Sequence, residues 1–378
     1  MMKTLMVEII LPNNKYPLEL ARQLNKIVDL TMFSKTSVGD IDSEISCKKK
    51  LYCGGEEKNK IISAFKYIKG MLSLSREIRR DYDVIHLQSF GYAGFETKIC
   101  MRMKRKDQAL VYTVHNVLPH EKKSSDKKFC KRLYDKCDAL IAHNEWTKTQ
   151  LVSEFDIREN KIHVIAHGIY GNMVANNKAC VERTSFLMFG LIRKYKGVDI
   201  LLKAISLLPS AIREKCRFII AGKQYPDKDP TDYEKMAEEL GLDADIKFML
   251  RRIEDEELPL LFENSDACVF PYREIYGSGS LLMAYTYQKP VITSNVPAFI
   301  EETQNGKTGL LFESEKPESL AEAIERFAGQ NEQQRQTYSN HIAELVNEKY
   351  NWILSAEKTA EVYRKAISLK GNKKRYDR

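Results

Sequence analysis

The sequence predicts an α/β protein made of two Rossmann-like domains, each built around a mainly parallel β-sheet. Three observations support this prediction. The chain has 378 residues, more than one hydrophobic core usually organises. Short runs rich in β-branched residues alternate with longer amphipathic segments, which is the pattern of repeated βα units. A second series of such runs begins near residue 185, after a segment without periodicity.

The first half of the chain contains six strand-like runs. They read LMVEIIL, LTMFS, VIHLQ, LVYTVHN, ALIAHN and IHVIAHG, and the amphipathic segment YPLELARQLNKIV follows the first of them. We therefore expect an N-terminal domain over residues 1–172. Residues 173–183 lack periodicity and are rich in Asn, which predicts a linker.

The second half repeats the alternation. Its strand-like runs are SFLMFG, RFIIAG, IKFML, ACVFP and PVITS, with predicted helices at Val198–Leu208 and Thr231–Leu240 between them. This pattern predicts a second Rossmann-like domain over residues 184–348. Residues 349–378 combine a long amphipathic helix pattern, NWILSAEKTAEVYRKAISLK, with the basic tail GNKKRYDR.

The composition is that of an ordinary soluble globular protein, with 43% hydrophobic and 30% charged residues. No apolar run reaches the roughly 20 residues that a membrane span needs. The first residues, MMKTLMVEIILPNN, lack the cleavage site of a signal peptide. The eight cysteines are scattered without CxxC pairs, which argues against a zinc site or a disulfide framework. We expect reduced cysteines and a cytosolic protein.

Charge is distributed unevenly along the chain. Residues 1–180 contain 31 Lys and Arg against 21 Asp and Glu, a balance of +10, while residues 181–378 contain 29 against 31, or −2. The excess is concentrated in Met101–Lys106 and Lys122–Arg132. Such segments suit an anionic membrane surface or a diphosphate-bearing lipid. Nucleic acid would satisfy them equally, and an ordinary solvated basic face is a third interpretation.

The stretch YREIYGSGSLLMAYTYQKPVI, from Tyr272 on, follows a predicted strand. In doubly wound folds, ligands bind at the carboxyl ends of the strands. Gly277 and Gly279 allow close approach, and the helix N-terminus behind them presents free N–H groups. Ser278 and Ser280 can cap the helix or donate hydrogen bonds. The turn predicts a phosphate cradle, while a plain glycine-serine linker is the alternative.

Basic residues after another strand of this half strengthen the prediction. The segment FGLIRKYKG places Arg193, Lys194 and Lys196 just beyond a strand, in a half whose net charge is −2. Fixed cationic donors are what a diphosphate needs. For Lys196 alone, the alternative interpretation is an exposed lysine that precedes a helix.

Together these segments resemble the family 4 glycosyltransferases, which have the GT-B fold of two facing Rossmann-like domains. The resemblance rests on FGLIRKYKGVDILLKAISLLP, FIIAGK and SDACVFPYREIYGSGSLLMAYTYQKPVITSNVPAFIEETQNGKTGLLFE, in the family's order across about 180 residues. VHNVLPHE and KIHVIAHGIYGN match in the first half. The chain is most similar to the branch of bacterial polysaccharide enzymes that includes certain mannosyltransferases. The resemblance also predicts that the last helix, from near Tyr350, crosses back to the first domain.

The resemblance implies transfer of a sugar from a nucleotide diphosphate donor. It implies that Lys196 neutralises the leaving diphosphate, that the backbone of Ser278–Ser280 receives the distal phosphate, and that Glu274 faces the donor sugar or ribose. His115 would lie across the cleft near the reacting carbon. The implied donor-binding residues are Arg193, Lys196, Gly222, Lys223, Glu274, Ser278, Gly279 and Ser280.

Neither a metal ion nor a bound cofactor is expected, because no Asp-x-Asp motif stands after a strand in a position to hold a divalent ion. The first domain is expected to bind the acceptor. If the reaction retains configuration, the leaving phosphate can deprotonate the acceptor, whereas inversion requires a protein base. His115, His120 and Glu121 are the candidates, with helix capping or loop packing as the competing role of the last two. His167 is expected to line the cleft on the acceptor side.

Two positions depart from the family pattern. The usual arginine directly after the glycine is Leu191 here, so Arg193 is expected to substitute from two positions later. The second glutamate of the family's paired signature falls on Met283, and Glu274 stands one place early. Recognition of the ribose by a second carboxylate is therefore not expected.

The sequence thus predicts a hexosyltransferase that uses a UDP- or GDP-sugar and a lipid-linked or growing glycan acceptor. Its expected pathway is synthesis of bacterial O-antigen, capsule or exopolysaccharide, at the inner face of the plasma membrane and without a nucleic acid partner. One alternative is a non-catalytic sugar-nucleotide-binding partner. Another is an inverting β-mannosyltransferase-type enzyme rather than a retaining one. A nicotinamide-dependent enzyme is disfavoured because no GxGxxG follows the first strand.

Overall fold

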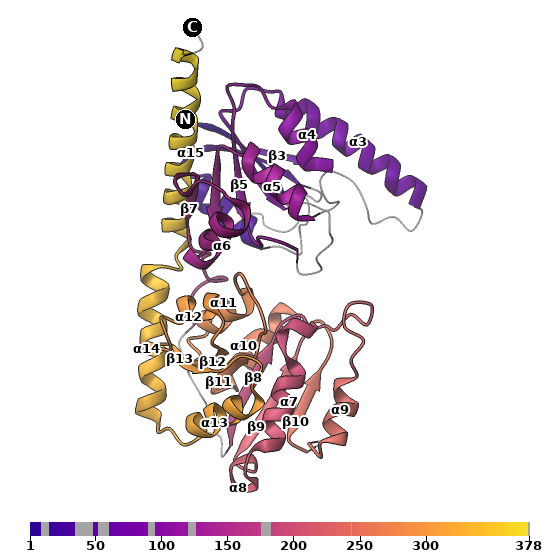
Figure 1. The fold of residues 1–378 in the computed structure, drawn as a ribbon, viewed down its shortest axis with the longest axis vertical. Coiled ribbons are helices and arrows are strands. Elements are labelled where there is room, and N and C mark those ends of the chain that lie inside the picture. The colour runs from indigo at the N-terminus through magenta and orange to yellow at the C-terminus, as the bar shows by residue number, and fades with distance from the viewer. Residues whose placement is uncertain are drawn as a thin grey trace. The chain divides into compact units, whose positions relative to one another are not determined.

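The structure is a computed structural model that describes residues 1–8, 15–34, 48–51, 60–89, 95–119, 126–174, 183–242 and 244–376. The chain forms two compact units (Figure 1). The first comprises Met1–Gly168 and Lys349–Arg378, and the second comprises Ile169–Glu348. Each unit has its own parallel sheet and its own buried core.

In the described part of the first unit, seven parallel strands form one sheet in the order β3-β2-β1-β4-β5-β6-β7. The strands are β1 (Lys3–Glu8), β2 (Asp29–Ser34), β3 (Lys48–Leu51), β4 (Val84–Ser89), β5 (Ala109–Val114), β6 (Ala139–Ala142) and β7 (Ile162–Val164). Nearly continuous apolar runs, such as ALVYTV in β5, are typical of parallel strands that are covered on both faces. The strand order reverses between β1 and β4.

Helices of the first unit pack around this sheet (Figure 1). They are α1 (Tyr16–Leu24), α3 (Lys60–Ile78), α4 (Phe95–Met103), α5 (Asp126–Lys136), α6 (Glu145–Phe155) and α15 (Trp352–Tyr376), with a 3₁₀ turn η1 (Glu159–Lys161). α1 has Pro17 in its first turn, where the missing N–H costs no helical hydrogen bond. α6 is capped by Asn144, whose side chain accepts a hydrogen bond of 2.8 Å from the N–H of Thr147.

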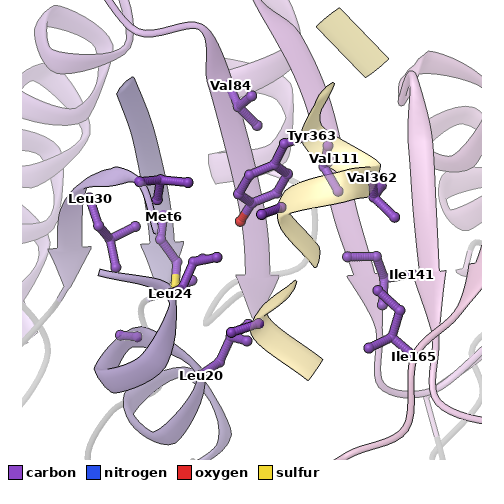
Figure 2. Close-up of a cluster of buried hydrophobic side chains, with 14 of the residues drawn as sticks. Met6, Leu20, Leu24, Leu30, Val84, Val111, Ile141, Ile165, Val362 and Tyr363 are labelled. Carbon is purple, nitrogen blue, oxygen red and sulfur yellow. The ribbon is translucent and has the colours of Figure 1, made fainter. Parts of the chain in front are cut away.

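The C-terminal helix α15 belongs to the first unit, which confirms the predicted return of this segment. Val362 and Tyr363 of α15 lie in one buried cluster with side chains of α1 and of the strands, including Met6 and Leu24 (Figure 2). The Tyr363 hydroxyl also lies 2.6 Å from Nδ1 of the buried His86. Long-range packing of this kind fixes the helix on the first sheet.

In the described part of the second unit, six parallel strands form a sheet in the order β10-β9-β8-β11-β12-β13. The strands are β8 (Thr184–Phe189), β9 (Cys216–Ala221), β10 (Ile246–Met249), β11 (Ala267–Phe270), β12 (Val291–Ser294) and β13 (Gly309–Phe312). The helices are α7 (Val198–Leu207), α8 (Ser210–Arg213), α9 (Tyr233–Glu239), α10 (Leu258–Glu263), α11 (Gly279–Thr286), α12 (Pro297–Glu302), α13 (Pro317–Ala328) and α14 (Glu332–Glu348), with 3₁₀ turns η2 (Lys194–Lys196) and η3 (Asp255–Glu257). The order reverses between β8 and β11.

These two doubly wound parallel sheets confirm the predicted fold class. The units divide at Gly168 rather than at residue 172, because the next residues pack on the second unit. Tyr170 lies against Gly279, and the Val174 N–H donates a 2.7 Å hydrogen bond to the carbonyl oxygen of Thr286. Most of the predicted linker, residues 175–182, lies outside the described residues.

Within the described ranges, no helix is both long and apolar enough to cross a membrane. The described cysteines Cys100, Cys130, Cys137, Cys216 and Cys268 are free thiols, as expected from their scattered positions.

Candidate active site

The candidate donor site lies where the strand order of the second sheet reverses. β8 and β11 are neighbours in the sheet, and the chain proceeds from them in opposite directions. The carboxyl ends of such a strand pair form the usual ligand position of a doubly wound sheet. Three segments meet there: the loop after β8 with η2, the loop after β11, and the start of α11.

Lys196 is the central side chain of this site. It is only 7% exposed, and its Nζ lies 3.3 Å from Oγ of Ser280 and 5.0 Å from the centre of the Tyr272 ring. Burial lowers the pKa of Lys196, and the nearby Arg193 lowers it further while Tyr195 opposes the shift. Among the described residues, no carboxylate forms an ion pair with this ammonium group. A buried cation without a counter-ion favours an anionic ligand.

Gly190, directly after β8, provides the space for this arrangement. Its φ is +119°, and a Cβ at this position would overlap Oγ of Ser280 and lie 2.8 Å from Nζ of Lys196. Gly222, after β9, has a φ of +149°, and a Cβ there would overlap the carbonyl oxygen of Gly190. Gly222 was expected to bind the donor, but what the structure shows is close packing on Gly190.

The N-terminus of α11 lies beside Lys196. Oγ of Ser278 accepts a 3.2 Å hydrogen bond from the N–H of Leu281 and caps the helix. The first N–H groups of a helix have no intrahelical acceptor, and the helix dipole makes this end positive. Tyr170 lies against the first residue, since a Cβ on Gly279 would meet its hydroxyl oxygen at 2.9 Å. The hydroxyl of Ser280 is the group that faces Lys196.

Two further cations lie around the aromatic ring of Tyr225. The guanidinium carbon of Arg193 lies 4.9 Å from the ring centre, and Nζ of Lys223 lies 4.6 Å from it. Nη1 of Arg193 is buried and has no hydrogen-bond partner among the described residues. Lys223 is exposed. Of these two predicted donor residues, Arg193 therefore has the stronger need for a ligand oxygen.

Arg273 is a residue that the sequence analysis missed. Its guanidinium group donates to both carboxylate oxygens of Asp199 at 3.1 and 2.7 Å, to the carbonyl oxygen of Lys194 at 2.7 Å and to Glu315 at 3.1 Å. These contacts join the loop after β11 to η2 and α7. The neighbouring Glu274 is exposed, as a residue that faces a ligand would be. No local signal distinguishes Arg273 from an ordinary surface arginine.

In the first unit, three histidines follow three adjacent strands and converge. His115 follows β5, His143 follows β6, and His167 lies beyond β7. The ring of Tyr16 has its centre 4.9, 4.9 and 4.8 Å from theirs, respectively. The ring centre of Trp352, in α15, lies 5.1 Å from that of His167. His143 was not among the predicted site residues, and it contacts His115 directly.

The hydrogen bonds of these histidines assign their protons. Burial lowers the pKa of His143 to about 4 and that of His115 well below its usual value, so both rings are neutral at pH 7. Nδ1 of His143 lies 3.1 Å from the carbonyl oxygen of Ile165 and must donate to it. Nε2 of His143 then accepts from Nδ1 of His115, at 3.2 Å. Nε2 of His115 is left as a buried lone pair with no partner among the described residues.

The other predicted groups are only partly placed. His120 and Glu121 lie outside the described residues. Nδ1 of His167 donates to the carbonyl oxygen of Gly168, and burial lowers the pKa of His167 to about 3. Within the part of the chain that the structure describes, no group of His, Cys, Asp and Glu side chains has the arrangement of a metal site.

The architecture and the second unit's site define a class: a two-domain Rossmann-like protein with an anion-binding position at a strand switch point. Comparison with known proteins specifies the family. A model described as Glycosyl transferases group 1 matches residues 173–366, and one described as Glycosyltransferase Family 4 matches residues 14–170. The chain belongs to the glycosyl transferases group 1 and is a glycosyltransferase with the GT-B fold.

Individual relatives are distant. D-inositol 3-phosphate glycosyltransferase from Corynebacterium aurimucosum is 23% identical, over 94% of this chain and 91% of that protein. GDP-mannose:glycolipid 4-beta-D-mannosyltransferase from Xanthomonas campestris pv. campestris is 25% identical, over 58% of this chain and 63% of that protein. The crystal structure of Anabaena Alr3699/HepE in complex with UDP and glucose superposes with a TM-score of 0.74 at 15% identity, over 97% and 100% of the two chains.

Proposed function

We propose that the protein transfers a hexose from a UDP- or GDP-sugar to a lipid-linked or growing glycan acceptor in the synthesis of bacterial surface polysaccharide. The observation that carries the donor assignment is the buried ammonium group of Lys196, which no described carboxylate neutralises. A nucleotide diphosphate supplies the missing negative charge at the place where ligands of doubly wound sheets bind. The complex of one structural neighbour with UDP and glucose, and the name of one relative as a GDP-mannose:glycolipid mannosyltransferase, support this proposal.

The donor residues act on the charge that develops as the glycosyl bond breaks. Lys196 and Arg193 stabilise the departing diphosphate, and the N–H groups at the start of α11 bind its distal phosphate. In this proposal the exposed Glu274 accepts hydrogen bonds from hydroxyl groups of the sugar or ribose. Lys223, being exposed, adds long-range attraction that salt screens. No step in this account requires a metal ion.

The neutral imidazole of His115 contributes from the first unit. Its Nε2 lone pair can accept a hydrogen bond from a hydroxyl group of the acceptor. In an inverting reaction, the same atom has the form required of a general base. The Nε2 lone pair of His115 can therefore position a hydroxyl group whether the reaction retains or inverts configuration.

The test is a thermal-shift titration of the whole protein with UDP, GDP and their hexose conjugates, with and without EDTA. We expect one nucleotide series to stabilise the protein, and EDTA to leave the shift unchanged. Transfer of the corresponding radiolabelled sugar to lipid extracts of polysaccharide-producing bacteria then tests the acceptor class. Absence of any nucleotide shift would refute the donor assignment, and a shift abolished by EDTA would refute metal independence.

A further inference from the structure

Helix α3 in the first unit carries an exposed apolar stripe. Phe65, Ile68 and Leu72 are 68, 56 and 53% exposed. These residues are spaced at i, i+3 and i+7, so they lie on one side of the helix. Ile61, one turn earlier on the same side, is 80% exposed. Single exposed apolar residues are common on soluble proteins, but a row of four on one helix is not.

The stripe is separate from the side of α3 that packs into the unit. Met71, Leu74 and Ile78 are buried, at 3% exposure or less. On a helical wheel these residues lie about 120° from the stripe, at about 100° per residue. α3 therefore has two apolar sides, of which only one contributes to the core. Figure 1 shows α3 beside α4, with its N-terminal end extending beyond the rest of the unit.

The exposed charged side chains that the structure describes on α3 and α4 are positive. Lys69 and Arg76 are exposed on α3, and Lys98 and Arg102 are exposed on the adjacent α4. The one acidic residue of α3, Glu77, is 5% exposed and accepts a hydrogen bond from the hydroxyl of Tyr82. An apolar side bordered by Lys and Arg is typical of a helix that lies in the interface of an anionic membrane.

The basic segments singled out from the sequence are less available. Nζ of Lys104 donates to the carbonyl oxygen of Gln108 at 3.0 Å, and Arg105 pairs with Asp107 and Asp81. In the second segment, Lys127 and Lys131 pair with Glu154 and Asp135 at 2.8 Å each. These internal pairs reduce the charge that the two segments present to a partner. The described surface thus favours α3 over the segments predicted from the sequence.

We propose that the α3 stripe, Ile61, Phe65, Ile68 and Leu72, is the surface by which this protein docks on an anionic lipid bilayer. The apolar side chains enter the boundary between headgroups and acyl chains, and Lys69 and Arg76 contact lipid phosphates. The purpose of docking, to bring the enzyme to a lipid-linked acceptor, rests on the proposed function. The docking itself does not depend on donor or acceptor, so it can be measured without them.

The experiment is flotation of the whole protein with vesicles of phosphatidylcholine, or of equal parts phosphatidylcholine and phosphatidylglycerol. The test variant carries Phe65→Ser, Ile68→Ser and Leu72→Ser. A charge variant carries Lys69→Gln and Arg76→Gln. The matched control carries Leu207→Ser and Leu260→Ser, which replace side chains of the second unit that are 52 and 66% exposed. Circular dichroism and the nucleotide-induced thermal shift are recorded for each variant.

We expect the wild-type protein and the control to float with phosphatidylglycerol vesicles. The triple variant should lose affinity by about ten-fold or more, and the charge variant by about five-fold for each cation removed. As a reporter that keeps the stripe apolar, Phe65→Trp should show a blue shift of its added emission on these vesicles and none on phosphatidylcholine alone.

Three outcomes would overturn the docking surface. The wild-type protein could bind neither vesicle, or the triple variant could float as well as the control. Sedimentation without lipid could also show self-association that only the triple variant loses, which would assign the stripe to a second copy of the chain. A missing nucleotide shift would instead count against the proposed function, so the two failures are distinguishable.

Discussion

Substituting Lys196 by Met separates the role of its charge from that of its packing. The variant keeps a long apolar side chain but removes the ammonium group of a residue that is 7% exposed, a group whose one hydrogen bond within the described residues is to Ser280, at 3.3 Å. Because burial lowers the pKa of Lys196, the unfolded chain holds this proton more tightly than the folded chain. The ligand-free variant should therefore be at least as stable as the wild type at pH 7.

The same reasoning fixes the sign of a pH effect. Between the lowered pKa of folded Lys196 and the ordinary value of 10.5, the unfolded state binds more protons. The free energy of unfolding of the wild type, relative to Lys196→Met, should therefore rise with pH across this window. Denaturant unfolding at a series of alkaline pH values measures the difference.

The expected loss of donor binding and catalysis is large. A unit charge pair about 4 Å apart contributes about 4 kcal/mol at an effective dielectric constant of about 20, and desolvation offsets part of this. Removing one preorganised donor to developing negative charge typically lowers the rate about 100- to 1,000-fold, or about 3–4 kcal/mol. We expect a decrease of this size in kcat/KM for the donor. The Kd for the nucleoside diphosphate should rise about ten-fold or more.

Steady-state transfer kinetics and calorimetric titration of the nucleoside diphosphate are the assays. Lys203→Met is the matched control, because Lys203 is an exposed lysine of the neighbouring helix α7. Lys203→Met should bind the nucleoside diphosphate with wild-type affinity. The reasoning is refuted if Lys196→Met also binds it with wild-type affinity.

Three further changes test other parts of the two units. His143→Phe should move the proton of His115 from Nδ1 towards Nε2, seen in ¹⁵N spectra of histidine-labelled protein, and should lower kcat. Because burial lowers the pKa of His143 to about 4, the unfolded state binds more protons than the folded state between pH 6.5 and about 4, and the wild type loses stability as the pH falls through this range. The variant should reduce the slope of the unfolding free energy against pH by about 1.4 kcal/mol per pH unit at most. Arg273→Met removes the cation that pairs with Asp199 and should cost about 1–3 kcal/mol of stability and raise KM for the donor. Gly190→Ala should weaken donor binding, because the new Cβ lies 2.8 Å from Nζ of Lys196.

Each of these predictions has a matched control. His143→Gln retains an acceptor for Nδ1 of His115, so it should keep the proton there; a spectrum like that of the Phe variant would contradict the assignment. Arg251→Met breaks an exposed pair with Glu257, and in chemical denaturation it should cost much less stability than Arg273→Met. If Arg251→Met lost as much stability as Arg273→Met, the contacts of Arg273 would have no special role in stability. Gly171→Ala adds a Cβ at a φ of +74° with nothing within 4 Å, and equal loss of donor binding would show that crowding is not the cause.

The prediction of the donor residues rests on signals that are local in the chain. A strand followed by FGLIRKYKG, and another followed by the turn at Gly277–Ser280, place Lys196, Arg193 and the α11 N-terminus at the same edge of a parallel sheet. Gly222 illustrates the limit of this reasoning, because it follows β9 and meets Gly190, which follows β8, only through the pairing of these two strands. The partners of Arg273 were equally hidden, since Asp199 lies 74 residues away in the chain.

By itself, the sequence determined the two doubly wound sheets, the return of the last helix to the first unit, and the family. Periodicity and turn chemistry are properties of neighbouring residues, so they can be recognised without coordinates. Only the tertiary structure decided which side chains lack partners. The missing counter-ion of Lys196, the proton assignment of His115 and the exposed stripe of α3 each depend on which distant residues approach and which do not, and hydrogen bonding and burial are set by that approach.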